Sequence, residues 1–240
     1  MRIAFLGPAP TFAARAAHAL APNAALVPCD SIAALFKALA VGDTDAILTP
    51  FENSVTGRVE ETLDALLALH HPVAVLDERV EAVRFSLYRR ARDKAPLGRV
   101  LGHSAALAQC ARWIARHHAK GVAVGSNGAA FAAVAAGDEP DAGALAPPGC
   151  ANGEMVEVAH NCQGAAANQT RFLLLGAEAP AAAMRALVFG HGSGAVEVTF
   201  PRPVAMDDLP GRALLLWAGE APTGSRVGWP SPTAHVWRLA

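Results

Sequence analysis

The sequence predicts an α/β protein in which short buried strands alternate with helices. Short apolar runs alternate with longer segments whose apolar residues recur at helical spacing. The connections between them are short and contain Gly, Pro, Asp and Ser, which favour turns and helix caps. With 240 residues, of which 52% are hydrophobic and 17% charged, the chain can bury a sizeable core. We therefore expect strand–helix alternation around a parallel sheet.

The first part of the chain shows this alternation clearly. A buried strand ends at Gly7-Pro8, and Thr11 can cap the helix that follows. Asp30-Ser31 can cap the next helix. The expected strands are 2–6, 25–27, 45–48 and 72–76; the expected helices run from Thr11 to about Leu20, from Ser31 to Gly42 with Ile32, Leu35, Phe36 and Leu39 on one face, and from Val59 to Leu69.

A charged step at Asp77-Glu78-Arg79 separates the strand-like runs 72–76 and 83–88. We interpret it as a hinge between two lobes near residues 77–80, with the chain returning near 160–170. A second set of elements follows the step: strands at 83–88, 100–101, 122–124, 141–145 and 155–158, and helices at 104–117 and 128–136. This pattern predicts two small α/β lobes with a cleft between them.

The composition changes after Gly176. Residues 177–183 resemble a linker, and the remaining pattern is rich in β-strand signals. The segment Gly190-His191-Gly192-Ser193-Gly194 is typical of a hairpin turn. We expect residues 1–178 to form one domain and residues 179–240 a small β-rich module with strands at 185–189, 194–200, 212–217 and 235–239.

The bulk properties argue against several function classes. The net charge is -1 and no basic stripe is visible, which argues against a nucleic-acid partner. The four cysteines form no CxxC pair and the nine histidines no HExxH, so we expect reduced thiols and no metal. No GxGxxG motif is present, and no apolar run approaches a membrane span. We expect a cytoplasmic protein that needs no cofactor and has no membrane partner.

Candidate binding groups stand side by side at Thr170-Arg171-Phe172, before the apolar run Leu173-Leu174-Leu175. A guanidinium can bind a carboxylate with two parallel hydrogen bonds, and a neighbouring hydroxyl can donate to the same ligand. This pair suits a small substrate that carries a carboxylate and an alcohol. The alternative is a solvated strand edge with a surface salt bridge.

Three further segments precede it in a fixed order. They are Phe5-Leu6-Gly7-Pro8-Ala9-Pro10-Thr11-Phe12, then Pro50-Phe51-Glu52-Asn53-Ser54-Val55-Thr56-Gly57-Arg58-Val59, then His103 with Gln109-Cys110 on the following helix. Together with Asn168-Gln169-Thr170-Arg171-Phe172, the four segments resemble the motifs GPxGTF, PxENSxxGxV, SHPxxxxQC and NxTRF of the prephenate dehydratase family. The resemblance covers roughly residues 1–178.

The resemblance implies a catalytic domain shaped like the type II periplasmic binding proteins. It implies a lyase of phenylalanine biosynthesis that removes water and carbon dioxide from prephenate to give phenylpyruvate, without a cofactor. By position, Thr170 would donate to the departing hydroxyl, and Arg171 and Phe172 would bind substrate. We also expect a homodimer.

The remaining candidate residues each have a second interpretation. Asn53 and Ser54 can bind an anion at the start of a helix, or simply cap it. Glu52 can orient these donors, accept a proton, or be a buried structural carboxylate. Thr11 can face the cleft or act as a helix cap. His103 can donate to a substrate carboxylate or shape its loop.

The sequence departs from the family pattern in loops of the expected site. Pro10 replaces a Gly, Arg58 stands where a small residue is common, and Gly102 and Ser104 replace the Ser and Pro beside the family's His. These changes leave open a related enzyme that acts on arogenate or a secondary metabolite, or that decarboxylates without aromatising. A non-catalytic binding module is a further alternative.

The family usually carries a phenylalanine-binding ACT domain after its catalytic domain, in the position that residues 179–240 occupy here. The GAL and ESRP signatures of that domain are absent from this sequence. We therefore expect a degenerate ACT-like module.

Overall fold

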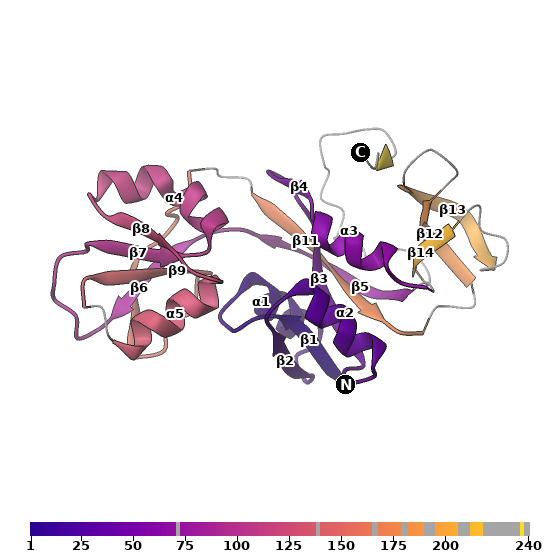
Figure 1. The fold of residues 1–240 in the computed structure, drawn as a ribbon, viewed down its shortest axis with the longest axis horizontal. Helices are drawn as coiled ribbons and strands as arrows, with labels where there is room; N and C mark the ends of the chain where they lie inside the picture. Colours follow the sequence, from indigo (N-terminus) through magenta and orange to yellow (C-terminus); the bar gives the residue numbers. More distant parts are fainter. Residues whose placement is uncertain are drawn as a thin grey trace. The chain divides into compact units, whose positions relative to one another are not determined.

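The computed structural model shows a mixed α/β fold with two sheets (Figure 1). It describes residues 1–70, 73–137, 140–164, 168–178, 182–189, 195–205, 212–217 and 236–237. The chain divides into two compact units. Unit 1 comprises residues 1–5, 16–81 and 170–240, and unit 2 comprises residues 6–15 and 82–169.

The sheet of unit 1 has the strand order β15-β13-β12-β14-β5-β11-β3-β1-β2, with β4 paired to β3. Helices α2 and α3 pack on β3 and on each other. The elements of its first part are β1 (Arg2–Leu6), α1 (Phe12–Leu20, whose first residues belong to unit 2), β2 (Ala25–Cys29), α2 (Ile32–Ala40), β3 (Ala46–Asn53), β4 (Gly57–Arg58), α3 (Glu60–Leu67), β5 (Val73–Ala82) and β11 (Gln169–Gly176).

Helix α2 forms for the reasons that its sequence suggests. Ser31 is its N-cap, and the side-chain oxygen of Ser31 accepts a hydrogen bond from the backbone N–H of Ala34 at 3.1 Å. The helix ends before Gly42, whose φ of +75° suits a residue without a Cβ. The four apolar residues expected on one face are all buried: Ile32, Leu35, Phe36 and Leu39.

Unit 2 contains a five-stranded sheet of order β10-β6-β9-β7-β8. Its strands alternate their side chains between two faces, so Leu87 and Val100 belong to one apolar cluster while Tyr88 and Leu101 belong to another. Helix α4 covers the first face and α5 the second. The elements are β6 (Ser86–Arg90), β7 (Arg99–Gly102), α4 (Ser104–Arg116), β8 (Lys120–Ala123), α5 (Asn127–Ala136), β9 (Ala142–Ala146) and β10 (Met155–Ala159).

The expectation of a parallel sheet is only partly correct, because the sheets of both units are mixed. In unit 1, β1 runs parallel to β3, but β11 runs antiparallel to it. The chain re-enters this sheet at Thr170, which pairs with Asn53 at the end of β3, so β11 must run in the opposite direction. In unit 2, β7 pairs in parallel with β8 and β9, whereas β6 and β10 form antiparallel pairs.

The strand end expected before Asp77-Glu78-Arg79 is also wrong, whereas the hinge near 77–80 stays a prediction. Strand β5 runs without interruption from Val73 to Ala82, and the division between the units falls after Glu81. The carboxyl groups of Glu78 and Glu81 are buried in ion pairs with Arg171 and Arg79. Charged residues can therefore lie inside this strand, because Arg171 of β11 and Arg79 of the same strand compensate the cost of burying their carboxyl groups.

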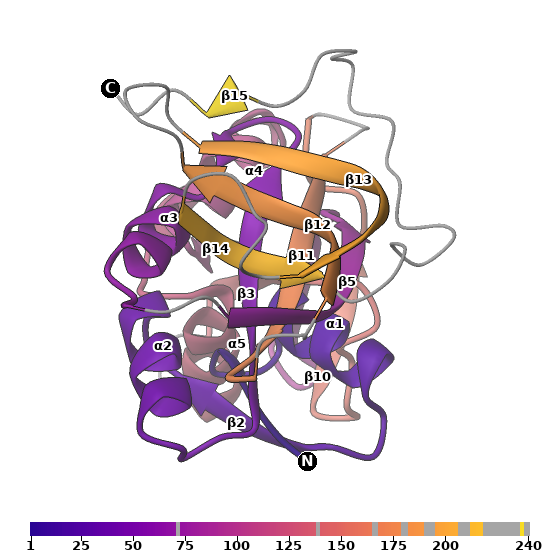
Figure 2. The same ribbon diagram turned by 90° about the vertical axis from the view of Figure 1, so that its right-hand side faces the viewer.

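The strands expected in the C-terminal part are confirmed as β12 (Ala182–Phe189), β13 (Ala195–Ala205), β14 (Arg212–Trp217) and β15 (Val236–Trp237). Figure 2 shows β12, β13 and β14 side by side, and β14 pairs in parallel with residues Val73–Val75 of β5. These strands thus extend the sheet of unit 1. The expected turn at 190–194 lies outside the described residues, and the division at 178/179 and the ACT-like character stay predictions.

The buried thiols of unit 2 allow a test of this fold. All four cysteines are free, and burial raises the pKa of Cys110 to about 12 and that of Cys162 to about 11. We expect a water-soluble disulfide reagent at pH 8 to modify Cys29 and Cys150 of the native protein first, because a thiolate is the reactive species. Modification should be followed by mass spectrometry of peptides, with urea-unfolded protein as the control in which all four react. Equal rates in the native protein would contradict the packing of β6, α4 and β7.

Candidate functional site

The site in unit 1 forms where the pairing of β3 with β11 becomes irregular. Phe172 pairs with Pro50 and Arg171 with Glu52, so the register shifts between these two pairs, and Phe51 lies at the β-bulge. The start of α3 supplies hydrogen-bond donors to this bulge. The backbone N–H of Val59 donates to the Phe51 carbonyl at 3.0 Å, and the Thr62 hydroxyl donates to the Pro50 carbonyl at 2.7 Å.

Beyond the bulge, Thr170 faces Asn53 across the ladder. The side-chain amide of Asn53 donates a hydrogen bond to the Thr170 hydroxyl oxygen at 2.9 Å. Among the residues that the structure describes, none accepts the proton of the Thr170 hydroxyl. The oxygen accepts from an amide, which polarises the hydroxyl group and makes its proton a better donor. Thr170 is half-buried, so this proton is available to a ligand.

The orientation of the Asn53 amide is fixed by a turn. Its oxygen accepts hydrogen bonds from the backbone N–H of Val55 at 2.9 Å and of Thr56 at 3.0 Å. These bonds define which end of the amide carries the oxygen, and they direct the NH2 group to Thr170. The turn closes through Gly57, whose φ of +82° favours glycine.

This turn corrects one sequence-based interpretation. Asn53 and Ser54 do not stand at the start of a helix, because residues 54–56 form a turn and β4 pairs back onto β3 before α3 begins at Glu60. The N-cap of α3 is Val59, which makes no side-chain capping bond. Ser54 lies exposed on the turn. The NH2 group of Asn53 is directed to Thr170, and substrate binding by Asn53 and Ser54 stays a prediction.

Arg171 is buried between two carboxyl groups, with only 7% of its surface exposed. Its Nε and Nη2 atoms donate to Glu78 Oε2 at 2.9 and 2.5 Å, and its Nη1 lies 3.7 Å from Glu52 Oε2. The guanidinium also lies 5.7 Å from the centre of the Phe51 ring, within the range of a cation–π contact. The salt bridge considered as the alternative for Arg171 is therefore present but buried, and substrate binding by Arg171 stays a prediction.

Two further candidates of unit 1 are buried. Glu52 is 5% exposed and lies beside Arg171, which favours its interpretation as a buried structural carboxylate. Phe172 is 4% exposed in β11, which favours a packing role over contact with substrate. Arg58, which departs from the family pattern, forms an ion pair with Glu60. Its charge therefore has a partner at the start of α3.

Thr11 and His103 belong to unit 2, where both act as helix caps. The Thr11 hydroxyl accepts from the backbone N–H of Ala14 at 3.1 Å and donates to the Leu6 carbonyl at 3.0 Å. Its single proton is thus used within the protein. The Nδ1 atom of His103 accepts from the backbone N–H of Ala105 at 3.3 Å, so the neutral ring carries its proton on Nε2. His103 is exposed and can offer this Nε2–H to a ligand.

The start of α5 brings these two capping segments together within unit 2. The side-chain oxygen of Asn127 accepts from the backbone N–H of His103 at 2.9 Å. The next residue, Gly128, lies against the loop before Thr11: a Cβ at position 128 would stand 1.8 Å from the Pro8 carbonyl oxygen. This contact needs glycine. Sequence analysis missed both residues, and the only local signal was the Ser126 cap of α5.

A second contact missed by sequence analysis joins two of the motifs. The side-chain amide of Asn168 donates to the Gln109 oxygen at 2.7 Å, and the backbone N–H of Gly164 donates to the Gln109 carbonyl at 2.9 Å. The Asn168 carbonyl accepts from the backbone N–H of Val83 at 2.8 Å. Asn168 therefore joins Gln109 of α4 to Val83 within unit 2.

The site residues favour chemistry by hydrogen bonding. Over the described part of the chain, no group of three or more His, Cys, Asp or Glu side chains is placed to hold a metal ion. None of the described helices is long and apolar enough to cross a membrane. In unit 1, the arrangement offers one oriented hydroxyl donor beside a buried guanidinium–carboxyl cluster. Such a donor can stabilise negative charge that develops on a leaving oxygen.

Comparisons with known proteins show which family the sequence resembles. The profile of the prephenate dehydratase family matches residues 3–180. A prephenate dehydratase of Amycolatopsis methanolica is 37% identical over 177 residues, which are 72% of this chain and 57% of the relative. Arogenate dehydratase 2 of Petunia hybrida is 32% identical over 180 residues, which are 74% of this chain and 45% of the relative. The chain thus spans about half the length of these relatives.

A solved structure supports the fold. The prephenate dehydratase of Arthrobacter aurescens, determined in complex with L-Phe, superimposes with a TM-score of 0.68 at 27% identity. The match covers 78% of this chain and 65% of that one.

The close approach of Gly128 to Pro8 gives a test of the unit 2 site. We expect Gly128→Ala to destabilise the protein by roughly 1–3 kcal/mol, because a methyl group would have to displace a backbone carbonyl. Helix propensity alone would favour the alanine by about 1 kcal/mol. The matched control is Gly125→Ala, since a Cβ there meets no atom within 4 Å. Urea unfolding of both variants is the measurement; equal stability of the two would contradict the packing of the loop on α5.

Proposed function

The chain belongs to the prephenate dehydratase family, and on this premise we propose that it catalyses the decarboxylating dehydration of prephenate to phenylpyruvate in phenylalanine biosynthesis. The observation that carries the proposal is the hydrogen bond from Asn53 to Thr170, which leaves the Thr170 hydroxyl proton for a ligand. The two residues come from the second and fourth motifs of the family resemblance. A cytoplasmic location and a homodimer complete the proposal.

The reaction needs help mainly at the leaving oxygen. In prephenate, loss of the ring carboxylate as carbon dioxide releases an electron pair into the ring, and the ring expels hydroxide at the opposite carbon. With one proton taken up, the products are phenylpyruvate, carbon dioxide and water. Aromatisation supplies the driving force. The Thr170 O–H donates to the departing oxygen, and this hydrogen bond strengthens as negative charge develops there.

Asn53 prepares Thr170 for this role. Its amide is held by the turn at residues 54–56, so the Thr170 oxygen is oriented before substrate binds. Preorganised donors lower a barrier because they need no rearrangement during the reaction. Arg171 is paired with Glu78, which supports an indirect role for its guanidinium. His103 Nε2–H is a candidate donor to a substrate carboxylate.

Arogenate is a second candidate substrate. It differs from prephenate by an amino group in place of the side-chain keto group, and the same hydroxyl leaves. The similarity to arogenate dehydratase 2 of Petunia hybrida favours this candidate, and the chemistry at Thr170 would be unchanged.

Product analysis tests the proposed function. We expect the purified protein, given prephenate in buffer with a metal chelator, to form phenylpyruvate, seen as aromatic ring protons by proton NMR. Olefinic protons with a retained ring alcohol would instead identify a non-aromatising decarboxylase. Phenylalanine formed only from arogenate would identify the second candidate. If neither compound is converted while prephenate raises the melting temperature, the protein is a binding module.

Substitution of Thr170 tests the mechanism. We expect Thr170→Ala to lower kcat by roughly 10²–10³, the loss typical of one preorganised donor. Thr170→Ser is the matched control, because it keeps the hydroxyl and should retain most of the activity. Circular dichroism and urea unfolding show whether both variants fold. Turnover of a folded Thr170→Ala variant within a few-fold of the parent would remove Thr170 from the mechanism.

A further inference from the structure

A buried charge cluster spans three neighbouring strands of the unit 1 sheet. Glu78 lies in β5, Arg171 in β11 and Glu52 in β3, and these strands are adjacent in the order β5-β11-β3. All three side chains are at most 7% exposed. The shortest contact joins Arg171 to Glu78, through two hydrogen bonds to the same carboxyl oxygen, whereas Glu52 lies 3.7 Å from the guanidinium.

From this geometry we propose that Glu78 is a positioning residue for the reaction: by holding Arg171, it keeps the neighbouring Thr170 hydroxyl in place against Asn53. The kinetic part of this inference rests on the proposed function. Glu78 contacts Arg171 and is buried, so it acts through Arg171 and not on substrate.

The β-bulge explains why Thr170 needs this support. Regular pairing of β11 with β3 extends from Gly176 to Phe172 and is then shifted at Phe51. Only the pairs Arg171–Glu52 and Thr170–Asn53 lie beyond the shift, at the end of the ladder. The regular part of the ladder therefore does not fix them. Side-chain contacts add to the backbone pairing at this end: Arg171 to Glu78, and Thr170 to Asn53.

Loss of the Glu78 charge would change the balance around Arg171. The guanidinium would keep Glu52 as a carboxyl partner, on the β3 side of the strand. A buried guanidinium that loses its closest carboxylate must move toward the other or toward water. Because Thr170 directly precedes Arg171 in β11, the backbone of Thr170 moves with that of Arg171. A displacement of about 1 Å at a reacting group can cost on the order of 10²-fold in rate.

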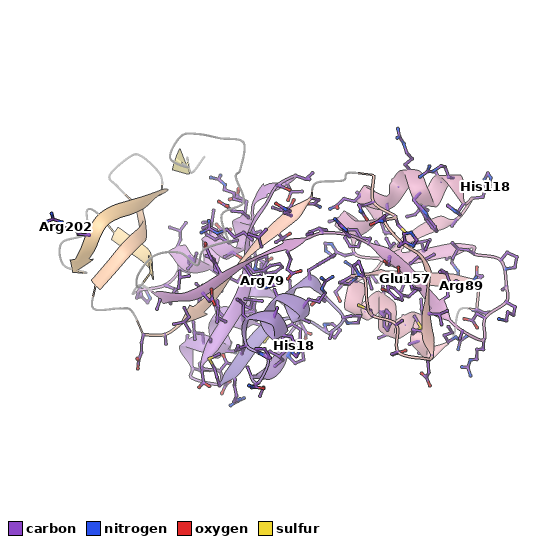
Figure 3. All side chains as sticks on the ribbon, turned by 180° about the vertical axis from the view of Figure 1, so that it is seen from behind. His18, Arg79, Arg89, His118, Glu157 and Arg202 are labelled. Atoms are coloured by element: carbon purple, nitrogen blue, oxygen red, sulfur yellow. The ribbon has the colours of Figure 1, made fainter. Side chains whose placement is uncertain are left out.

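Strand β5 provides a matched control. Glu81 is 5% exposed, comparable with Glu78, and forms an ion pair with Arg79. The side chain of Arg79, labelled in Figure 3, is 41% exposed. Glu81→Gln therefore removes a buried carboxylate from the same strand while the ion pair of Arg171 with Glu78 is kept.

The test is a double-mutant cycle between Glu78 and Thr170. We expect Glu78→Gln to lower kcat by roughly 10–10²-fold with KM changed by less than about 3-fold, because orientation of the donor is lost while binding groups remain. In a Thr170→Ala background, the same change should lower kcat by less than about 3-fold, since the positioned group is absent. Glu78→Asp should recover part of the loss, and Glu81→Gln should leave kcat unchanged.

Several outcomes would overturn the inference. A kcat loss of equal size in both backgrounds would show that Glu78 acts independently of Thr170. Unchanged kcat with lower stability would show a purely structural role. A change confined to KM would show that Arg171 binds substrate and that Glu78 tunes this binding. If Glu78→Gln does not fold, the Glu78→Asp variant carries the same cycle.

A readout that needs no turnover separates this inference from the proposed function. The side-chain amide resonances of Asn53, assigned by NMR, report the bond to Thr170. We expect them to shift in Glu78→Gln and to stay in place in Glu81→Gln. Shifted resonances in a protein that converts no prephenate would refute the proposed function and keep the positioning role. Unchanged resonances in folded Glu78→Gln would refute the positioning role, whatever the activity.

Discussion

The antiparallel pairing of β11 with β3 is the constraint on which the unit 1 site depends. It brings Thr170 beside Asn53 although 117 positions separate them in sequence. The bulge at Phe51 then shifts the register of the last pairs, and α3 stabilises it by donating to the carbonyls of Pro50 and Phe51. Without the shift, the residues beyond it would pair with different partners. Because side chains alternate between the two faces of a strand, a shift of one residue moves each side chain to the opposite face of the sheet. The bulge thus decides which side chains meet.

The buried cluster around Arg171 shows how a charged group can serve a site without contacting a ligand. Burying one guanidinium is costly unless carboxyl groups and hydrogen bonds compensate it. Glu78 supplies two hydrogen bonds, Glu52 a longer ion pair, and Phe51 a ring at cation–π distance. These partners come from β5 and β3, on both sides of β11. The cost of burial is therefore coupled to the alignment of three strands, which suits a site that needs a fixed hydroxyl.

Unit 2 contains a different kind of local order, based on helix caps. Thr11, His103 and Ser126 each accept a backbone N–H at the start of a helix. Asn127 and Gly128 then connect the His103 and Thr11 segments, one through a hydrogen bond and the other through the absence of a side chain. Capping also determines which groups remain for a ligand: the Thr11 proton is used internally, whereas His103 presents Nε2–H.

The sequence by itself determined the α/β class, most strands and helices, the caps Ser31 and Thr11, and the motif residues of the candidate site. These features depend on neighbours in the chain: apolar spacing, a capping side chain, or an ordered set of motifs. Tertiary structure decided the rest. The antiparallel return of β11, the uninterrupted course of β5, and the partners of Arg171 depend on contacts between distant segments. From its neighbours alone, Asp77-Glu78-Arg79 looks like the end of a strand. No local pattern shows that a guanidinium 93 positions away will compensate the burial of Glu78.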